Sequence, residues 1–212
     1  MDSTSQPRER SEPGYREYDN FAFHPYNVML ALVLFGICAL FLAFSIAFIY
    51  SRVQSDLPPV KLPILFVFNT LILLGSSATL VWAKRAYLQD NTRQYQQALW
   101  ATLGLSILFL GAQIFAWRQL FMQEIFVHSD TSASYLYLIS GLHFAHVIAG
   151  IPFLAVFLWQ AYQRMKEPVS VLVYFSDPEK RLRLRLLSIY WHFLDLLWVY
   201  LVLFFWINYL VR

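Results

Sequence analysis

Residues Val28–Tyr50 read VMLALVLFGICALFLAFSIAFIY, a stretch without a single Asp, Glu, Lys or Arg. An α-helix of about 20 apolar residues spans the roughly 30 Å of hydrocarbon in a bilayer. Because no water is available there to bond the backbone amides, such a segment is stable in the membrane as a helix. The stretch therefore predicts a membrane-spanning helix.

Four more apolar runs follow along the chain, and only the last contains a charged residue, Asp195. The composition of the 212 residues agrees, since 58% are hydrophobic and 14% are charged, whereas about a quarter of a soluble domain is charged. We predict an all-α membrane protein with a five-transmembrane-helix bundle, at about residues 28–50, 62–83, 98–117, 134–160 and 186–211.

The segments outside the runs define the domain organisation. Residues 1–25 begin with a polar stretch that carries three Arg and five acids, which predicts a polar cytoplasmic N-terminal tail with no signal peptide. Residues 26–212 form the predicted transmembrane domain. The basic residues lie between apolar runs rather than in one patch, so nucleic-acid binding is not expected. The single cysteine, Cys38, lies in an apolar run and offers no disulfide framework.

The positions of the 16 Lys and Arg predict the orientation. Twelve of them fall in the tail and in the second and fourth loops, and four fall in the first and third loops or at the C-terminus. Because positive charges gather on the cytoplasmic side, we expect the N-terminus in the cytoplasm and the C-terminus outside.

Ionisable side chains are costly inside hydrocarbon, and those that remain usually have a partner within the protein. In the fourth run, His143 and His146 share a helix face with Gly150 at 100° per residue. In the last run, Asp195 shares a face with Trp191 and Trp198, and His192 lies one turn before it. The two sets start from opposite leaflets on antiparallel helices, so direct contact between them does not follow from the sequence.

Four roles fit this constellation. Interhelical hydrogen bonding is favoured, in which histidine and aspartate satisfy one another, tryptophan N–H groups or backbone carbonyls. A proton relay, contact with lipid headgroups or a partner subunit, and a metal or haem site are the alternatives. Two histidines three residues apart are weak evidence for a metal, because a haem also needs ligands fixed by neighbouring groups. We therefore predict no metal in this chain.

Other residues in the runs point to helix packing. Gly141, Ala145 and Ala149 are spaced by four on the face opposite His143, where another helix can approach closely. Asn69 and Gln113 are interpreted as structural polar residues that bond between helices. No nucleophile–base pair, phosphate-binding loop or HExxH motif is present, so no catalytic residue is predicted.

Two stretches resemble a known family. SGLHFAHVIAG (Ser140–Gly150) and YWHFLDLLWVYL (Tyr190–Leu201) are similar to the paired signatures of subunit III of the heme-copper oxidases, approximately G-x-H-x-x-H-V-x-x-G and W-H-F-x-D-x-x-W. The resemblance spans about residues 62–210, and the five predicted helices match the shorter bacterial type. Acidic residues that are usual in the family are replaced by Lys61 and Arg185, and another is missing near Ala116.

The resemblance implies an accessory subunit of a proton-pumping terminal oxidase of the cytochrome c type in the bacterial cytoplasmic membrane. Such a subunit belongs to an enzyme complex but has no active site of its own. It stabilises catalytic subunit I, contacts other oxidase subunits and phospholipids, and in some complexes lies within a respiratory supercomplex. Haem and copper are then held by the partners. Alternatives are subunit III of a quinol oxidase, the similar partner of a nitric oxide reductase and, in another class, a small proton-linked transporter.

Overall fold

The computed structural model describes residues 25–55, 63–127, 130–165 and 167–210. In that part of the chain it contains helices and no strand. The helices are α1 (Pro25–Ser55), α2 (Leu65–Leu88), α3 (Thr92–Met122), α4 (Thr131–Arg164), α5 (Pro168–Ser176) and α6 (Pro178–Leu210). Five of them are long and apolar enough to cross a membrane, which confirms the predicted all-α bundle. The predicted tail before Pro25 lies outside the described residues.

Most helix ends extend beyond the predicted bounds, although α2 begins at Leu65, three residues after its predicted start. The largest difference is in α6, which begins at Pro178 rather than near Leu186. The predicted start of the last span stops at Arg185, but the helix begins before it because Lys and Arg lay their apolar stems along it and keep their charges in water. The segment between the fourth and fifth predicted spans also contains a short helix, α5.

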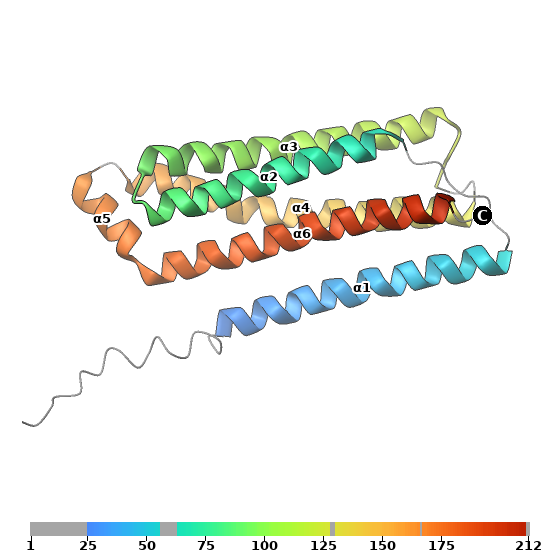
Figure 1. Ribbon diagram of the computed structural model, residues 1–212, viewed down its shortest axis with the longest axis horizontal. Helices are drawn as coiled ribbons and strands as arrows, with labels where there is room; N and C mark the ends of the chain where they lie inside the picture. The colour runs from blue at the N-terminus through green and yellow to red at the C-terminus, as the bar shows by residue number, and fades with distance from the viewer. Residues whose placement is uncertain (1–24, 56–62, 128–129, 166, 211–212) are drawn as a thin grey trace, which may run out of the picture.

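The long helices run roughly side by side along the longest axis of the molecule (Figure 1). Helices α2 and α3 form one side, α4 and α6 lie in the middle, and α1 lies on the other side (Figure 1). The main contacts of α1 are with α4 and α6, whereas α2 packs most extensively on α3. The short α5 connects α4 to α6 at one end of the bundle.

A tight turn joins α2 to α3. The amide of Asn91 donates to the carbonyl of Ala86 over 3.0 Å, and Asp90 takes a positive φ of 53°. The side chain of Asn91 then caps α3 by accepting a hydrogen bond from the amide of Gln94 over 3.1 Å, as Asn commonly does at this position. This turn brings the two helices back against each other over their full length.

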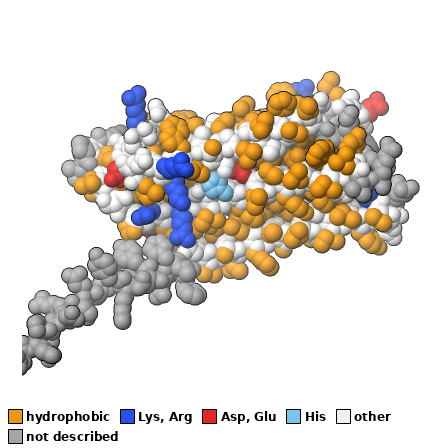
Figure 2. Space-filling view, viewed as in Figure 1, with side chains coloured by type: hydrophobic (Ala, Val, Ile, Leu, Met, Phe, Trp, Pro, Cys, Tyr) orange, Lys and Arg blue, Asp and Glu red, His pale blue; other side chains and the backbone are white. Residues whose placement is uncertain are grey.

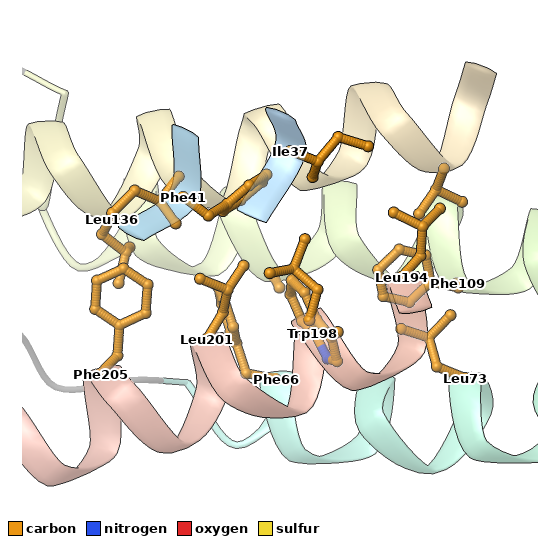
Figure 3. Close-up of a cluster of buried hydrophobic side chains, with 14 of the residues drawn as sticks. Ile37, Phe41, Phe66, Leu73, Phe109, Leu136, Leu194, Trp198, Leu201 and Phe205 are labelled. Carbon is orange, nitrogen blue, oxygen red and sulfur yellow. The ribbon is translucent and has the colours of Figure 1, made fainter. Parts of the chain in front are cut away.

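Buried aromatic and aliphatic side chains fill the centre of the bundle. Figure 3 shows one of the two buried clusters, in which α1 contributes Ile37 and Phe41 and α6 contributes Trp198. Large hydrophobic side chains also cover the outside (Figure 2), such as Phe35 at 72% and Leu196 at 69% exposure. A protein in water does not present an apolar surface of this extent, so the exterior is suited to lipid.

Candidate functional site

His143 lies fully buried between α4 and α6. Its Nε2 donates a hydrogen bond to the backbone carbonyl of Leu194 over 3.1 Å. The imidazole lies 4.9 Å from the Trp198 ring and meets Phe109 edge-on at 5.8 Å, measured between ring centroids. The structure therefore brings the fourth and last predicted helices into direct contact at His143, a contact that their spacing in the sequence left open.

His146 has different neighbours from His143. Its Nδ1 donates to the carbonyl of Leu142 in its own helix over 2.7 Å, and its ring lies 5.9 Å from that of Phe41 in α1. The backbone carbonyl of His146 accepts a hydrogen bond from the Tyr190 hydroxyl over 2.9 Å. The side chains of the two histidines thus contact different helices, α6 and α1, and do not converge on one point.

Side-chain hydrogen bonds connect two consecutive residues of α6 with two consecutive residues of α2. The Trp191 Nε1 donates to the Ser76 hydroxyl over 3.1 Å, and the Ser77 hydroxyl lies 2.6 Å from the His192 Nδ1. The sequence by itself does not indicate that Ser76 and Ser77 make these contacts. Their pairing with Trp191 and His192 depends on how α2 and α6 are rotated against each other, and periodicity within one helix does not define that rotation.

Asp195 is buried in α6, with 4% of its surface exposed. Neither carboxylate oxygen makes a well-formed hydrogen bond to a described residue, although the Ser77 hydroxyl lies beside the group. The expected pairing of Asp195 with a histidine or a tryptophan N–H is therefore not seen in the described part of the chain. The histidines instead contact backbone carbonyls and a serine.

Asn69 and Gln113 form a buried amide pair between α2 and α3. The Asn69 Nδ2 donates to the Gln113 Oε1 over 2.8 Å, and both side chains are fully buried. Further along the same helices, the Thr79 and Thr102 hydroxyls lie 2.9 Å apart. These contacts are of the kind that polar side chains make between membrane helices.

Gly150 lies where α4 passes close to two aromatic side chains of α6. A Cβ atom built on Gly150 would lie 2.8 Å from the Trp191 Cζ3 and 3.1 Å from the Tyr190 Cε1. Only glycine fits here without a shift of the neighbouring rings. The terminal glycine of the first motif and the first tryptophan of the second are therefore in contact.

The small-residue stripe of α4 faces outward. Ala145 and Ala149 are exposed, and nothing lies within 4 Å of a Cβ atom built on Gly141. The stripe was predicted to receive another helix, but no described helix of this chain occupies it. The packing role of Gly141, Ala145 and Ala149 stays a prediction that requires another chain.

The described residues contain no group of three or more His, Cys, Asp or Glu side chains arranged to hold a metal ion. One contact that the sequence analysis did not identify lies at the opposite end of the bundle from α5. There the Arg52 guanidinium at the end of α1 donates to the backbone carbonyl of Asn208 and, over 3.3 Å, to its side-chain oxygen. An arginine in the last turn of a span is the signal that could have indicated it.

The sequence of the chain is similar to those of several known proteins. The subunit 3 of cytochrome c oxidase from Prototheca wickerhamii is 34% identical over 146 residues, or 68% of this chain and 49% of the relative. The protein of that name from Papio hamadryas is 29% identical over 147 residues, or 69% of this chain and 50% of the relative. That from Pisaster ochraceus is 28% identical over 204 residues, or 88% of this chain and 73% of the relative.

The chain spans about half the length of several curated relatives that it matches, including those from Prototheca and Papio. The family model for cytochrome c oxidase subunit III extends further along this chain and matches residues 24–209, which include all six helices almost completely. Because the match covers far more than half of the sequence, the chain belongs to the cytochrome c oxidase subunit III family.

Proposed function

We propose that this chain is a non-catalytic accessory subunit of a proton-pumping terminal oxidase of the cytochrome c type. The family match over residues 24–209 carries the proposal. The geometry supports it, because His143 and His192 are engaged in contacts between helices. In this role the chain stabilises the catalytic subunit and holds no redox centre of its own.

We further propose that the chain lies in a bacterial cytoplasmic membrane with its N-terminus in the cytoplasm. The distribution of the 16 Lys and Arg supports this orientation. The partners are catalytic subunit I, which would hold haem and copper, other oxidase subunits and phospholipids, and the complex could lie within a supercomplex. The exposed stripe of Gly141, Ala145 and Ala149 supports contact with another membrane helix.

Purification of the tagged chain in mild detergent tests the proposal. We expect a larger haem-containing subunit to co-purify, identified by its mass and by the visible spectrum of the complex. After this chain is separated from its partners, it should carry neither iron nor copper. A stripped chain that retains stoichiometric metal would contradict the accessory role, and proton flux in liposomes from this chain alone would favour the transporter.

The variant Asp195→Asn tests whether the buried carboxyl group is structural. We expect the haem spectrum of the complex to stay unchanged, while the variant holds its partner less firmly or loses activity severalfold faster during turnover. The reason is that Asp195 is buried beside α2, where an amide cannot replace the carboxyl group without new hydrogen-bond demands. Asp90→Asn, in an exposed turn, is the control. Loss of the haem signal from an otherwise intact complex would argue against this role.

A further inference from the structure

A pocket of about 550 Å³ lies at the end of the bundle where α5 leads into α6. The last turns of α2, the end of α5 and the first turns of α6 line it. The pocket is separate from the buried contacts of His143 and Asn69, and its volume is within the range of about 300–1,000 Å³ that is usual for ligand sites. Three of its lining residues are basic: Lys84, Arg181 and Arg185.

The two acidic side chains at the junction of α5 and α6 have cationic partners. Asp177, which lines the pocket, pairs with the Lys180 Nζ over 3.1 Å, and Glu179 pairs with Arg183. The ion pairs found among the described residues do not involve Lys84, Arg181 or Arg185. The pocket lining therefore carries three positive charges and one carboxylate that is already paired, and this excess of positive charge favours an anionic ligand.

The side chains, and not the start of α6, would have to recognise that anion. The first residue of α6 is Pro178, which has no amide hydrogen, and the amide of Glu179 already donates to the Asp177 side chain over 3.0 Å. Guanidinium groups suit a phosphate, because their paired N–H groups match its oxygens. Arg181 and Arg185 are one helical turn apart and both line the pocket, so they can address the same group.

The apolar surroundings indicate that the phosphate belongs to a lipid. The pocket lies at the ends of two membrane-spanning helices, where headgroups are found. Leu88 on its wall is 53% exposed, and Leu172 and Val173 on the adjoining α5 are 66% and 63% exposed. Figure 2 shows Lys and Arg side chains gathered near this end of the bundle, directly beside the hydrophobic surface.

We propose that the pocket formed by Lys84, Arg181 and Arg185 binds the phosphate headgroup of an anionic phospholipid. The acyl chains would then lie along the exposed apolar side chains of α2 and α5. A basic pocket between membrane helices is an established way to hold such lipids. The inference rests on the proposed function, because it gives a site and a charge class to the lipid contact that belongs to it.

The test compares two double variants of the complete chain, purified with its partners in mild detergent. Arg181→Gln with Arg185→Gln removes two charges from the pocket. Arg85→Gln with Arg93→Gln removes two exposed charges from the same end of the bundle but outside the pocket. Retained phospholipids are identified by mass spectrometry. The thermal midpoint of each protein is then measured with micelles that contain phosphatidylglycerol, and separately with inorganic phosphate at the same concentration.

We expect the wild type and the control to retain anionic phospholipid and to be stabilised by phosphatidylglycerol. The pocket variant should lose most of the retained anionic lipid and most of that stabilisation. Equal retention in both double variants would overturn the proposal. A wild type that inorganic phosphate stabilises as strongly as the lipid would also overturn it, and would assign the pocket to a soluble anion.

Two further measurements keep the outcome clear. If the double variant does not accumulate, Lys84→Gln replaces it and should also reduce the retained lipid. The haem spectrum of the same samples reports on the partner. If the wild type purifies without a haem-containing partner, the result contradicts the proposed function. If the partner is present but the variants retain as much lipid as the wild type, the result contradicts the headgroup site.

Discussion

Gly150 shows at the scale of a single residue how the two histidine-containing motifs fit together. The Gly150→Ala variant places a Cβ atom 2.8 Å from Trp191 and 3.1 Å from Tyr190. Both rings are large and lie against α4, so α4 and α6 must separate slightly. We expect a loss of about 1–3 kcal/mol of stability, which is typical of overpacking, seen as a lower thermal midpoint in detergent.

Gly141→Ala is the matched control, because it makes the same substitution in the same helix. Nothing lies within 4 Å of its added methyl group, and alanine is the better helix former. We expect no loss of stability in the isolated chain. If both variants lowered the midpoint equally, the cause would lie in the helix itself and not in the contact with Trp191.

The three histidines of the two motifs differ in their hydrogen-bond partners. His143 contacts a backbone carbonyl of α6, His146 a carbonyl of its own helix, and His192 a serine of α2. For His143 and His192 the hydrogen-bond partner lies on a neighbouring helix, whereas His146 reaches another helix only through the contact of its ring with Phe41 of α1. Removal of one histidine is therefore expected to affect a different helix contact in each case.

At the scale of an element, the joint between α5 and α6 depends on Asp177. Burial by itself raises the pKa of this carboxyl group, but hydrogen bonds from the Lys180 side chain and from the Glu179 amide outweigh it and hold the pKa below its ordinary value of 3.8. Because the folded pKa is below the unfolded one, the contribution to stability is complete above the unfolded value. It is lost as the pH falls through the folded pKa.

At neutral pH, the Asp177→Asn variant should therefore behave like the wild type at acidic pH, because both have an uncharged side chain at this position. We expect faster hydrogen exchange at the amides of the first turn of α6, after correction for intrinsic rates. The wild type should approach the variant as the pH falls below about 4. Glu179→Gln is the control, because its ion pair with Arg183 is exposed to water, and pairs of that kind contribute little. If both variants accelerated hydrogen exchange equally, Asp177 would not be the residue that stabilises the first turn of α6.

Helix α1 packs on the bundle with one face and also bonds to α6 at its last turn. It packs mainly on α4 and α6, and Arg52 in its last turn bonds to Asn208 near the end of α6. Its exposed side chains, such as Phe35 and Val53, cover most of its length. The contact at Arg52 thus fixes the end of a helix that otherwise faces outward along much of its surface.

At the scale of the whole molecule, the orientation in the membrane leads to a labelling prediction. Gln89 follows α2 and Gln123 follows α3, so they lie at opposite ends of the bundle, and both are exposed. In a Cys38→Ser background, we expect a membrane-impermeant maleimide to label Gln123→Cys in intact spheroplasts, because that end carries few positive charges. Gln89→Cys should be labelled only after the cells are lysed. The reverse pattern would place the N-terminus outside.

The sequence alone is sufficient to predict the five membrane-spanning segments. Hydropathy is a property of consecutive residues, and each run is long enough to cross the bilayer. It also predicts which residues share a helix face, because the helical repeat is constant. His143 with Gly150, and Trp191 with Asp195, follow from spacing in this way. The ends of the helices do not follow, because charged residues can continue a helix into water, as in α6 from Pro178.

Only the tertiary structure decided which faces meet. The contacts of His143 with the Leu194 carbonyl, of His192 with Ser77 and of Asn69 with Gln113 join residues that are far apart in the sequence. The rotation and depth of each helix depend on how large side chains such as Trp191 and Tyr190 pack against neighbours as small as Gly150. This shape complementarity is a property of two helix surfaces together, so it cannot be predicted from the periodicity of a single helix.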